Sequence, residues 1–412
     1  MGQARNMLII GGGAAGLVAG IQLLRGGAAV TVCERAPRVG KKLITTGNGT
    51  CNIGNRDLTV SHYHGADPDF VRPALSAFSA QDAVAFFASI GVDVVTRADG
   101  KMYPRCLQAS AVLDCLRATF ADLGGTLCTE TEIVRLTPHK GGVTAVSANG
   151  DTMTADRVLV CTGGAASPSC GGSTGGYALL ESLGHKRMPL FPSVVPLKTD
   201  TTYLRAVKGI RTDATLTLLI DGHAVAAHTG ELLFTEYGLS GPVTLQIARV
   251  VGDWERKQRG RATARIDLLP ELDSHALTAL LRGRRALDGG HRPLELFFTG
   301  LLHNRVGQTV IRAAGLSLTD AASSLTDRDI ATLVRGIKAW EVAVTGTTGL
   351  AHAQVTAGGI ATADFDPATM RSRLCDRVFA AGEVLDIDGD CGGFNLHFAF
   401  ASATLAARGM LV

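Results

Sequence analysis

Three glycines near the amino terminus have the spacing of a turn that binds phosphate groups. Gly11, Gly13 and Gly16 form the pattern G-x-G-x-x-G between an apolar strand predicted over residues 7–10 and an apolar helix predicted over residues 14–24. The first glycine permits a tight turn, the second lets the backbone approach a pyrophosphate, and the third lets the helix pack close to the strand. The free N–H groups at the start of the helix would then face the phosphates.

A carboxylate follows the second predicted strand, residues 30–33. Glu34 can accept hydrogen bonds from both hydroxyls of an adenosine ribose, and it would repel a 2′-phosphate. The order strand, turn, helix, strand and acid therefore predicts a site for FAD or NAD rather than NADP. A glycine-rich loop without a ligand is one alternative, and a signal peptide or membrane span over the uncharged residues 7–24 is another. Three adjacent glycines argue against a stable membrane helix.

The composition indicates a globular protein with room for two or three domains. The chain has 412 residues, of which 46% are apolar and 19% are charged, and its formal net charge is +3. This charge predicts no strong overall attraction to nucleic acid. The nine cysteines include no C-x-x-C pair, which favours reduced thiols and a cytoplasmic location over a disulfide framework or a zinc site. No other apolar run approaches membrane length, so we expect no membrane span.

One segment is more basic than the rest of the chain. Its cations between residues 256 and 285 are Arg256, Lys257, Arg259, Arg261, Arg265, Arg282, Arg284 and Arg285. A solvated charged face is the favoured interpretation, and a patch for RNA or an anionic substrate is the alternative.

The predicted elements divide the chain into four segments. The pattern is α/β over residues 1–188, β-rich over 189–270, mainly helical over 271–345 and α/β again over 346–412. The last segment returns to complete the first. We therefore predict an α/β fold in which a split Rossmann-like FAD-binding domain carries an inserted β-rich and helical domain.

Turn and periodicity signals predict individual elements within these segments. Asp221-Gly222 marks a hairpin between strands at 214–220 and 223–228. Further strands are expected near 126–136, 262–269 and 377–381. Helices are predicted at 79–90, 108–123, 243–251, 274–286, 293–302, 305–314, 327–340 and 395–408.

A second glycine-rich segment, residues 380–397, could hold the flavin end of FAD. Glu383 ends a predicted strand and is placed to bind the ribityl hydroxyls. After the Gly392-Gly393 turn, the amides near Phe394 and Asn395 would face the flavin N1/O2 edge, where the reduced ring carries negative charge. An ordinary loop and helix cap is the alternative.

The loop over residues 41–55 is rich in glycine and asparagine, and such a loop can wrap a cofactor with its backbone amides. Asn48, Cys51 and Asn52 are its candidates to face the flavin, and a surface turn is the alternative. Close packing near the flavin is favoured for Cys51 over a redox role, because it lacks a resolving cysteine at fixed spacing. The candidate cofactor-binding residues are Gly11, Gly13, Ala14, Ala15, Gly16, Glu34, Arg35, Lys42, Asn48, Cys51, Asn52, Thr162, Gly163, Gly382, Glu383, Gly393, Phe394 and Asn395.

Several uncommon motifs occur in one order along nearly the whole chain. They are IIGGGAAGL at 9–17, GKK…TGNGTCNIGN at 40–55, TGG…GSTGGYALLESLGH at 162–185, PSVVPL at 192–197, GELLFTEYGLSGP at 230–242, VTGT at 344–347, QVTAGGI at 354–360 and AGEVLDIDGDCGGFNL at 381–396. In these motifs the chain resembles the BaiN/YhiN-type family of FAD-dependent oxidoreductases.

The resemblance implies a bipartite FAD domain with a barrel-like β insertion and a helical segment. It also implies that a reduced nicotinamide drives the reduction of activated C=C bonds. Activities proposed for the family include the reduction of conjugated bile-acid enones and of a uracil ring in RNA.

The chain departs from the family pattern near the expected site. Thr50 stands where the family commonly has arginine in G-G-R-C-N, which puts an anion-binding arginine in doubt here. Phe394, His397 and Phe398 stand in the segment that commonly contains G-Y-N-L-Q-W, so a tyrosine hydroxyl is lost.

Two side chains are the candidate catalytic residues, each as a proton donor. They are Tyr103, in the segment GKMYPR, and His397, near the start of the last predicted helix. A packed core or edge side chain is the alternative for both. His62 and His64 form an H-x-H pair without a third ligand, so we expect no metal site.

We predict an oxidoreductase that keeps FAD bound and uses NAD(P)H to reduce an activated C=C bond, such as a conjugated enone, by hydride transfer through flavin N5. The chain has no second dinucleotide fingerprint, so NAD(P)H is expected as a transient visitor. The alternatives are a flavin-dependent RNA uridine reductase that forms dihydrouridine, and an FAD-dependent amine or aminoketone oxidase. The expected partner is a small-molecule substrate, and nucleic acid is not favoured.

Overall fold

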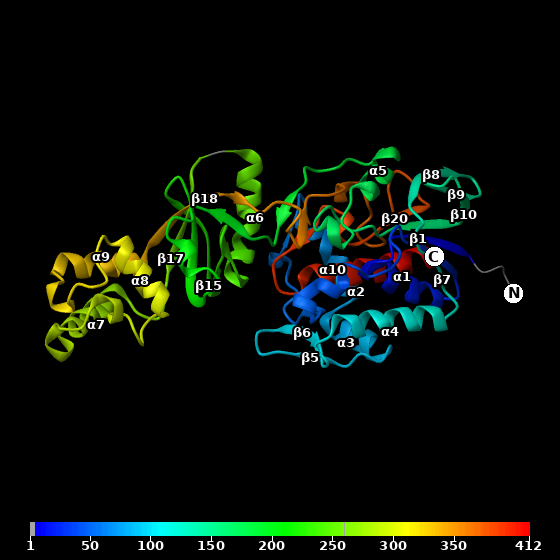
Figure 1. Ribbon diagram of the computed structural model, residues 1–412. Helices are drawn as coiled ribbons and strands as arrows, with labels where there is room; N and C mark the ends of the chain where they lie inside the picture. The colour runs from blue at the N-terminus through cyan, green and yellow to red at the C-terminus, as the bar shows by residue number, and fades with distance from the viewer. Residues whose placement is uncertain (1–4, 259) are drawn as a thin grey trace. The chain divides into compact units, whose positions relative to one another are not determined.

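The computed structural model describes residues 5–258 and 260–412, and the chain folds into two compact units (Figure 1). Met1–Pro192 and Leu350–Val412 together form the first, which we call the Rossmann unit. Ser193–Gly349 form the second, which we call the inserted unit. The Rossmann unit is therefore split in sequence.

A parallel sheet is the centre of the Rossmann unit. Its strand order is β20-β11-β1-β2-β7, and all neighbouring pairs are parallel. Met7 to Ile10 are all buried, because both faces of the sheet are covered. The edge strand β20 comes from the last segment of the chain. The five strands are β1 (Asn6–Ile10), β2 (Ala29–Cys33), β7 (Thr126–Cys128), β11 (Arg157–Val160) and β20 (Val378–Ala380).

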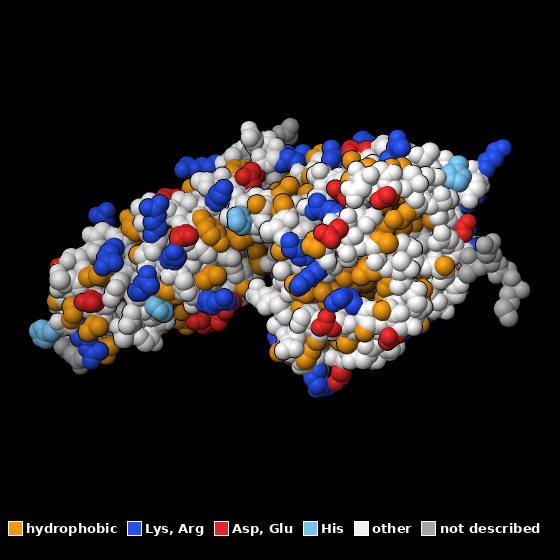
Figure 2. Space-filling model, turned by 45° about the vertical axis from the view of Figure 1, so that its right-hand side comes forward, with side chains coloured by type: hydrophobic (Ala, Val, Ile, Leu, Met, Phe, Trp, Pro, Cys, Tyr) orange, Lys and Arg blue, Asp and Glu red, His pale blue; other side chains and the backbone are white. Residues whose placement is uncertain are grey.

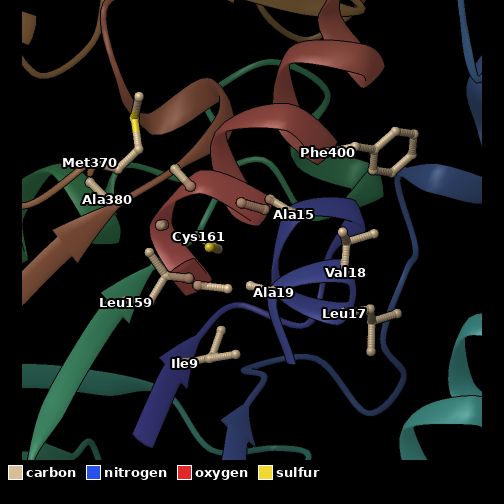
Figure 3. Packing of buried hydrophobic residues seen from close by; sticks show 14 of the residues in the cluster. Ile9, Ala15, Leu17, Val18, Ala19, Leu159, Cys161, Met370, Ala380 and Phe400 are labelled. Carbon is tan, nitrogen blue, oxygen red and sulfur yellow. The ribbon is translucent and has the colours of Figure 1, made fainter. Parts of the chain in front are cut away.

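Two helices, α1 (Ala14–Arg25) and α10 (Phe394–Leu411), pack against each other beside this sheet. Figure 3 shows Ile9, Ala19 and Leu159 within the same buried cluster. Most side chains of α10 are buried. Among the helices of residues 5–258 and 260–412, none is long and apolar enough to cross a membrane.

Smaller elements complete the Rossmann unit. Ser79 caps α3 through a capping box with Asp82. The remaining helices are α2 (Arg72–Ala77), α3 (Ala80–Ala88), α4 (Ala109–Asp122) and α5 (Gly175–Ser182). The remaining strands are β3 (Gly54–Asn55), β4 (Tyr63–His64), β5 (Val94–Thr96), β6 (Lys101–Pro104), β8 (Ile133–His139), β9 (Gly142–Ser147), β10 (Thr152–Ala155), β12 (Phe191–Ser193), β19 (Val355–Ala357) and β21 (Asp388–Gly389).

The inserted unit contains a closed barrel with the strand order β13-β16-β15-β14-β17-β18. The predicted hairpin turn at Asp221-Gly222 is confirmed, and both residues have the positive φ that such a turn requires. The strands are β13 (Leu197–Thr199), β14 (Arg211–Ile220), β15 (His223–Phe234), β16 (Gly238–Ser240), β17 (Ala262–Asp267) and β18 (Trp340–Thr347). The helices are α6 (Pro242–Lys257), α7 (Ser274–Ala286), α8 (Asn304–Ala313) and α9 (Asp327–Lys338).

The structure corrects the expected elements at three places. The helix expected at 293–302 is only a 3-10 turn, Leu294–Leu296, because Pro293 precedes it and Gly300, at φ +78°, cannot continue a right-handed helix. The strand expected near 126–136 is broken into β7 and β8, with Glu130 in a left-handed conformation between them. Residues 340–347 form the barrel strand β18, although the predicted helical segment extended to residue 345.

One polar side chain is enclosed within α10. His397 is fully buried, and its Nε2 lies 2.8 Å from the carbonyl oxygen of Phe78. Burial lowers the pKa of His397 from its ordinary 6.5 to about 4 and outweighs that hydrogen bond. The imidazole is therefore neutral at physiological pH.

The close contact between α1 and the glycine turn predicts the effect of a single methyl group. A Cβ added at Gly16 would lie 1.9 Å from the carbonyl oxygen of Gly11, whereas nothing lies within 4 Å of one added at Gly13. We expect Gly16→Ala to destabilise the protein by about 2 kcal/mol or more, and Gly13→Ala by less than about 1 kcal/mol. Urea unfolding followed by far-ultraviolet circular dichroism measures both, and equal losses would contradict the close packing.

The buried imidazole predicts a dependence of stability on pH. Unfolded His397 binds a proton below about pH 6.5 and folded His397 only below about pH 4, so the unfolded chain binds more protons in between. Stability should therefore fall as the pH falls through this window, by up to roughly 3 kcal/mol from this residue. The free energy of unfolding of His397→Gln should not show this decrease between pH 7 and pH 4. The control variant His139→Gln, which changes an exposed histidine, should show the same decrease as the wild type. An unchanged pH profile in His397→Gln would contradict the prediction.

Candidate functional site

Four segments of the Rossmann unit begin at the carboxyl ends of neighbouring parallel strands. Gly11 directly follows β1 and Glu34 directly follows β2, while one residue separates Thr162 from β11 and Gly382 from β20. These ends lie close together: a Cβ at Gly11 would be 2.5 Å from the carbonyl oxygen of Cys161. Open α/β sheets bind their ligands along this edge.

The glycine turn leaves an open space in front of the first helix. Gly11 has φ +107°, and Gly13 is the N-cap of α1 without a side chain that could accept from the free amides. Ala14 and Ala15 begin the helix, and no atom lies within 4 Å of a Cβ at Gly13. This turn is a cradle of unpaired N–H groups, which is a suitable receptor for phosphate oxygens.

Glu34 is held against this turn by two hydrogen bonds. Its Oε2 accepts from the amide of Gly12 at 2.9 Å, and its Oε1 accepts from the amide of Ala36 at 2.8 Å. Arg35 turns elsewhere, since its guanidinium donates to the carbonyl oxygens of Gly171 and Gly172. The structure thus gives Arg35 a partner in the protein and Glu34 a fixed place beside the turn.

Glu383 connects three segments through its carboxylate. Oε2 lies 2.7 Å from the ammonium of Lys42, and Oε1 accepts from the amide of Thr356 at 2.8 Å. A Cβ at Gly164 would lie 2.6 Å from Oε1, so the turn after β11 also touches this carboxylate. Gly163 in that turn has φ +72° and nothing within 4 Å of an added Cβ, and Gly382 beside Glu383 has φ +75°. Lys42 is thereby fixed with its charge at the strand ends.

The three candidate side chains in the loop after Lys42, those of Asn48, Cys51 and Asn52, lie in different surroundings. Asn48 is exposed in a left-handed conformation. The side-chain oxygen of Asn52 lies against the Gly393 backbone, where a Cβ would be only 2.7 Å away. Cys51 is fully buried, and burial raises the pKa of its thiol to about 11. Cys51 is therefore a packed, protonated thiol, and its place beside the flavin stays a prediction.

The start of α10 packs tightly on the loop before it. Gly393 is the N-cap at φ +98°, and a Cβ there would lie 2.5 Å from the carbonyl oxygen of Gly54. The side chain of Asn395 accepts from the amide of Gly389 and donates to its carbonyl oxygen. Phe394 is nearly buried. The backbone amides of the first turn, rather than these side chains, remain as ligand-binding groups.

The two candidate catalytic residues differ in their surroundings. His397 is enclosed and neutral, as described above, which weighs against a proton donor, and its catalytic role stays a prediction. Tyr103 lies half-buried on β6, with the guanidinium of Arg97 4.3 Å above its ring. Tyr103 as a proton donor remains a prediction.

The sequence did not reveal the contact of Asp390 with His62 and His64. This carboxylate accepts hydrogen bonds from both His62 and His64, the pair considered above only as metal ligands. The sequence signal was only their closeness, because His62 ends the 3-10 turn Val60–His62 and His64 lies on β4. Among the described residues, no group of three or more potential metal ligands could hold an ion.

The basic segment of the inserted unit is largely occupied by contacts within the protein. Arg282 and Arg285 both pair with Asp327, while Arg284 donates to the carbonyl oxygens of Phe297 and Thr299. Arg256 and Lys257 pair with Asp253, and Arg265 pairs with Glu341. Arg259 lies outside the described residues. On the face that Figure 2 shows, Lys and Arg are scattered with Asp and Glu among them. This agrees with a solvated charged face.

Comparison with known proteins matches the chain from end to end. It is 35% identical over 405 residues to the 3-dehydro-bile acid delta(4,6)-reductase of Clostridium scindens, covering 97% of each protein. It is 28% identical over 413 residues to the ribosomal RNA dihydrouridine synthase of Haemophilus influenzae, covering 99% of this chain and 98% of the relative. A solved 3-ketosteroid delta1-dehydrogenase from Sterolibacterium denitrificans shares the fold, with a TM-score of 0.55, 11% identity and 99% of both chains covered.

These matches confirm the predicted fold class, which is a split Rossmann-like FAD-binding domain with an inserted barrel and helical segment. They also show that the protein is an oxidoreductase. The family description "HI0933-like protein Rossmann domain" matches residues 5–409. This is the family that the motifs resembled: the chain belongs to the HI0933-like, or BaiN/YhiN-type, Rossmann-domain family.

Proposed function

We propose that this protein binds FAD at the carboxyl edge of its parallel sheet and uses NAD(P)H to reduce an activated C=C bond in a small molecule. The observation that supports this most is the open glycine turn with Glu34 fixed beside it, in a chain that a bile-acid reductase matches over 97% of its length. The residues fit FAD because the turn has room and unpaired amides for a pyrophosphate, and because Glu34 has acceptor oxygens for a ribose.

The residues at the strand ends have distinct tasks in this proposal. The backbone N–H groups of Ala14, Ala15 and Gly16 bind the phosphates, and the carboxylate of Glu34 orients the adenosine ribose. Glu383 holds Lys42, so that one cation stays beside the ribityl chain at a fixed position. The first amides of α10, at Phe394 and Asn395, place the positive end of the helix dipole where negative charge develops. When bound, FAD supplies the hydride carrier that no side chain provides.

The reduction of a uridine ring in RNA is the second candidate. It is favoured by the two relatives named as ribosomal RNA dihydrouridine synthases, which this chain matches over 99% and 98% of its length. The internal pairing of Arg282, Arg284 and Arg285 weighs against a free basic surface on that helix. The small-molecule reductase is therefore the function we favour.

Filling the open side of the glycine turn should remove FAD without unfolding the protein. Gly13 has φ −83°, which valine can adopt, and a Cβ there meets no protein atom within 4 Å. We expect Gly13→Val to purify colourless and to bind FAD at least 100-fold more weakly, since the side chain occupies the phosphate position. Flavin absorbance after reconstitution measures this, and circular dichroism checks the fold. A folded Gly13→Val protein that is fully yellow would place the pyrophosphate elsewhere.

Anaerobic stopped-flow kinetics can separate the candidate functions. We expect NADH or NADPH to bleach the bound flavin, and a conjugated enone such as 4-androstene-3,17-dione to restore its colour. Restoration only by a uridine-containing ribosomal RNA fragment would support the second candidate, and its rate should fall steeply with salt. Bleaching only by an amine, with peroxide formed in air, would contradict both and favour an oxidase. The colourless Gly13→Val protein is the matched control for each reaction.

A further inference from the structure

Two histidines and one aspartate form a hydrogen-bonded group immediately before α10. We call His62, Asp390 and His64 the His–Asp–His cluster. Oδ2 of Asp390 lies 3.0 Å from Nδ1 of His62, and Oδ1 lies 2.8 Å from Nε2 of His64. Each carboxylate oxygen of Asp390 thus accepts a hydrogen bond from a different imidazole.

The backbone and a neighbouring ring hold this cluster in place. β4 pairs with β21, so that His64 is opposite Asp388, and the amide of Asp390 donates to the carbonyl oxygen of His62 at 2.9 Å. The ring of His62 stacks on Phe394, the first residue of α10, with centroids 4.2 Å apart. Asn395 donates to the carbonyl oxygen of Asp390. The cluster is therefore fixed to the same helix start that the proposed function assigns to the flavin.

Several charged or titratable groups surround the cluster. Burial raises the pKa of Asp390, but hydrogen bonds from His64 and His62 outweigh it and hold the pKa below its ordinary value, so this carboxylate is anionic at neutral pH. Asp57, on the loop after β3, lies 3.4 Å from Nε2 of His62. Asp388, on β21, is opposite His64. Cys391 follows Asp390 and interacts electrostatically with Lys101 on β6.

The two imidazoles differ in their unused nitrogen atoms. His62 has one nitrogen on Asp390 and the other on Asp57. His64 has only Nε2 engaged, and within residues 5–258 and 260–412 its Nδ1 makes no hydrogen bond. Side-chain exposure is 33% for His64 and 30% for His62, so both rings are open to small molecules. Nδ1 of His64 is the atom of the cluster that can pass a proton to another molecule.

We propose that His64, oriented by Asp390, is the proton donor of the reduction, and that Asp390 and His62 are positioning residues. This inference rests on the proposed function. The substrate gains a hydride on one carbon of its double bond, and the π electron pair moves to the other carbon. That carbon forms a bond to the Nδ1 proton of His64, and the Nδ1–H bond breaks. The donor is the imidazolium form of His64, which carries a proton on each nitrogen. His64 becomes neutral and regains a proton from water, while NAD(P)H supplies the hydride and is oxidised.

Nitrogen-15 NMR of the histidine rings tests the geometry without any substrate. An Asp390 that accepts from Nε2 of His64 should fix neutral His64 as the Nε2–H tautomer. His64→Gln identifies the resonance, and Asp390→Asn should mix the two tautomers. His139→Gln, an exposed histidine on another sheet, is the control. A neutral His64 of Nδ1–H form, or a tautomer that Asp390→Asn does not change, would overturn the arrangement.

The two half-reactions test the chemistry on the FAD-loaded enzyme. His64→Gln should slow reoxidation of the reduced flavin by the enone or the uridine RNA at least 100-fold, while reduction by NAD(P)H stays within about threefold. The wild-type reoxidation rate should fall as the pH rises, because the donor must be protonated, and His64→Gln should lose this dependence. Asp390→Asn should slow the same step by about tenfold.

The outcomes separate this inference from the function on which it rests. A wild-type enzyme that neither acceptor reoxidises would contradict the proposed function and this donor together, before any variant is compared. A wild-type enzyme that is reoxidised, beside a His64→Gln variant with the same rate and the same pH dependence, would overturn the donor alone. Equal slowing of both half-reactions in His64→Gln would mean a structural role and would also overturn it.

Discussion

The pairing of β20 with β11 is the constraint on which the candidate site depends. Val378 to Ala380 align with Val158 to Val160 in parallel, so the last segment of the chain joins the sheet that the first segment begins. Parallel pairing makes all strand ends point the same way, and the loops after β1, β2, β11 and β20 therefore meet at one edge. Without this pairing, Glu383 could not reach Lys42, which lies 341 residues earlier in the sequence.

The packing behind this edge explains why its polar groups are so well fixed. Gly16 and Gly11 bring α1 into backbone contact with the turn, and α10 packs on α1 with most of its residues buried. Burial in this core favours the neutral forms of His397 and Cys51, because it lowers the pKa of the imidazole and raises the pKa of the thiol. At the edge, Glu383 pairs with Lys42, and Asp390 pairs with its two imidazoles.

The sequence predicted those parts of the fold that local physics decides. The helix at 274–286 has the predicted bounds because Asp273 caps it and its apolar residues repeat with helical period. The segment at 293–302 has similar apolar residues, but Pro293 and Gly300 stop a helix there. The strand β18 was missed because its role depends on pairing with β17 and β13, which are distant in sequence. Motif spacing located the glycine turn and Glu34, since their chemistry is encoded within one strand–helix–strand unit.

Sequence alone could not rank the histidines, because their chemistry depends on which face of an element is buried. His397 follows the Gly392-Gly393 turn closely and seemed suited to donate a proton, yet its position on α10 points it into the core toward Phe78. His62 and His64 seemed to lack a partner, because Asp390 is more than 300 residues away in sequence. A group that must exchange protons with both water and substrate needs partial exposure and a carboxylate that fixes its tautomer. Of the two arrangements, only the pair beside Asp390 meets both conditions, and the same loop that holds Asp390 leads directly into the helix start where the proposed flavin would lie.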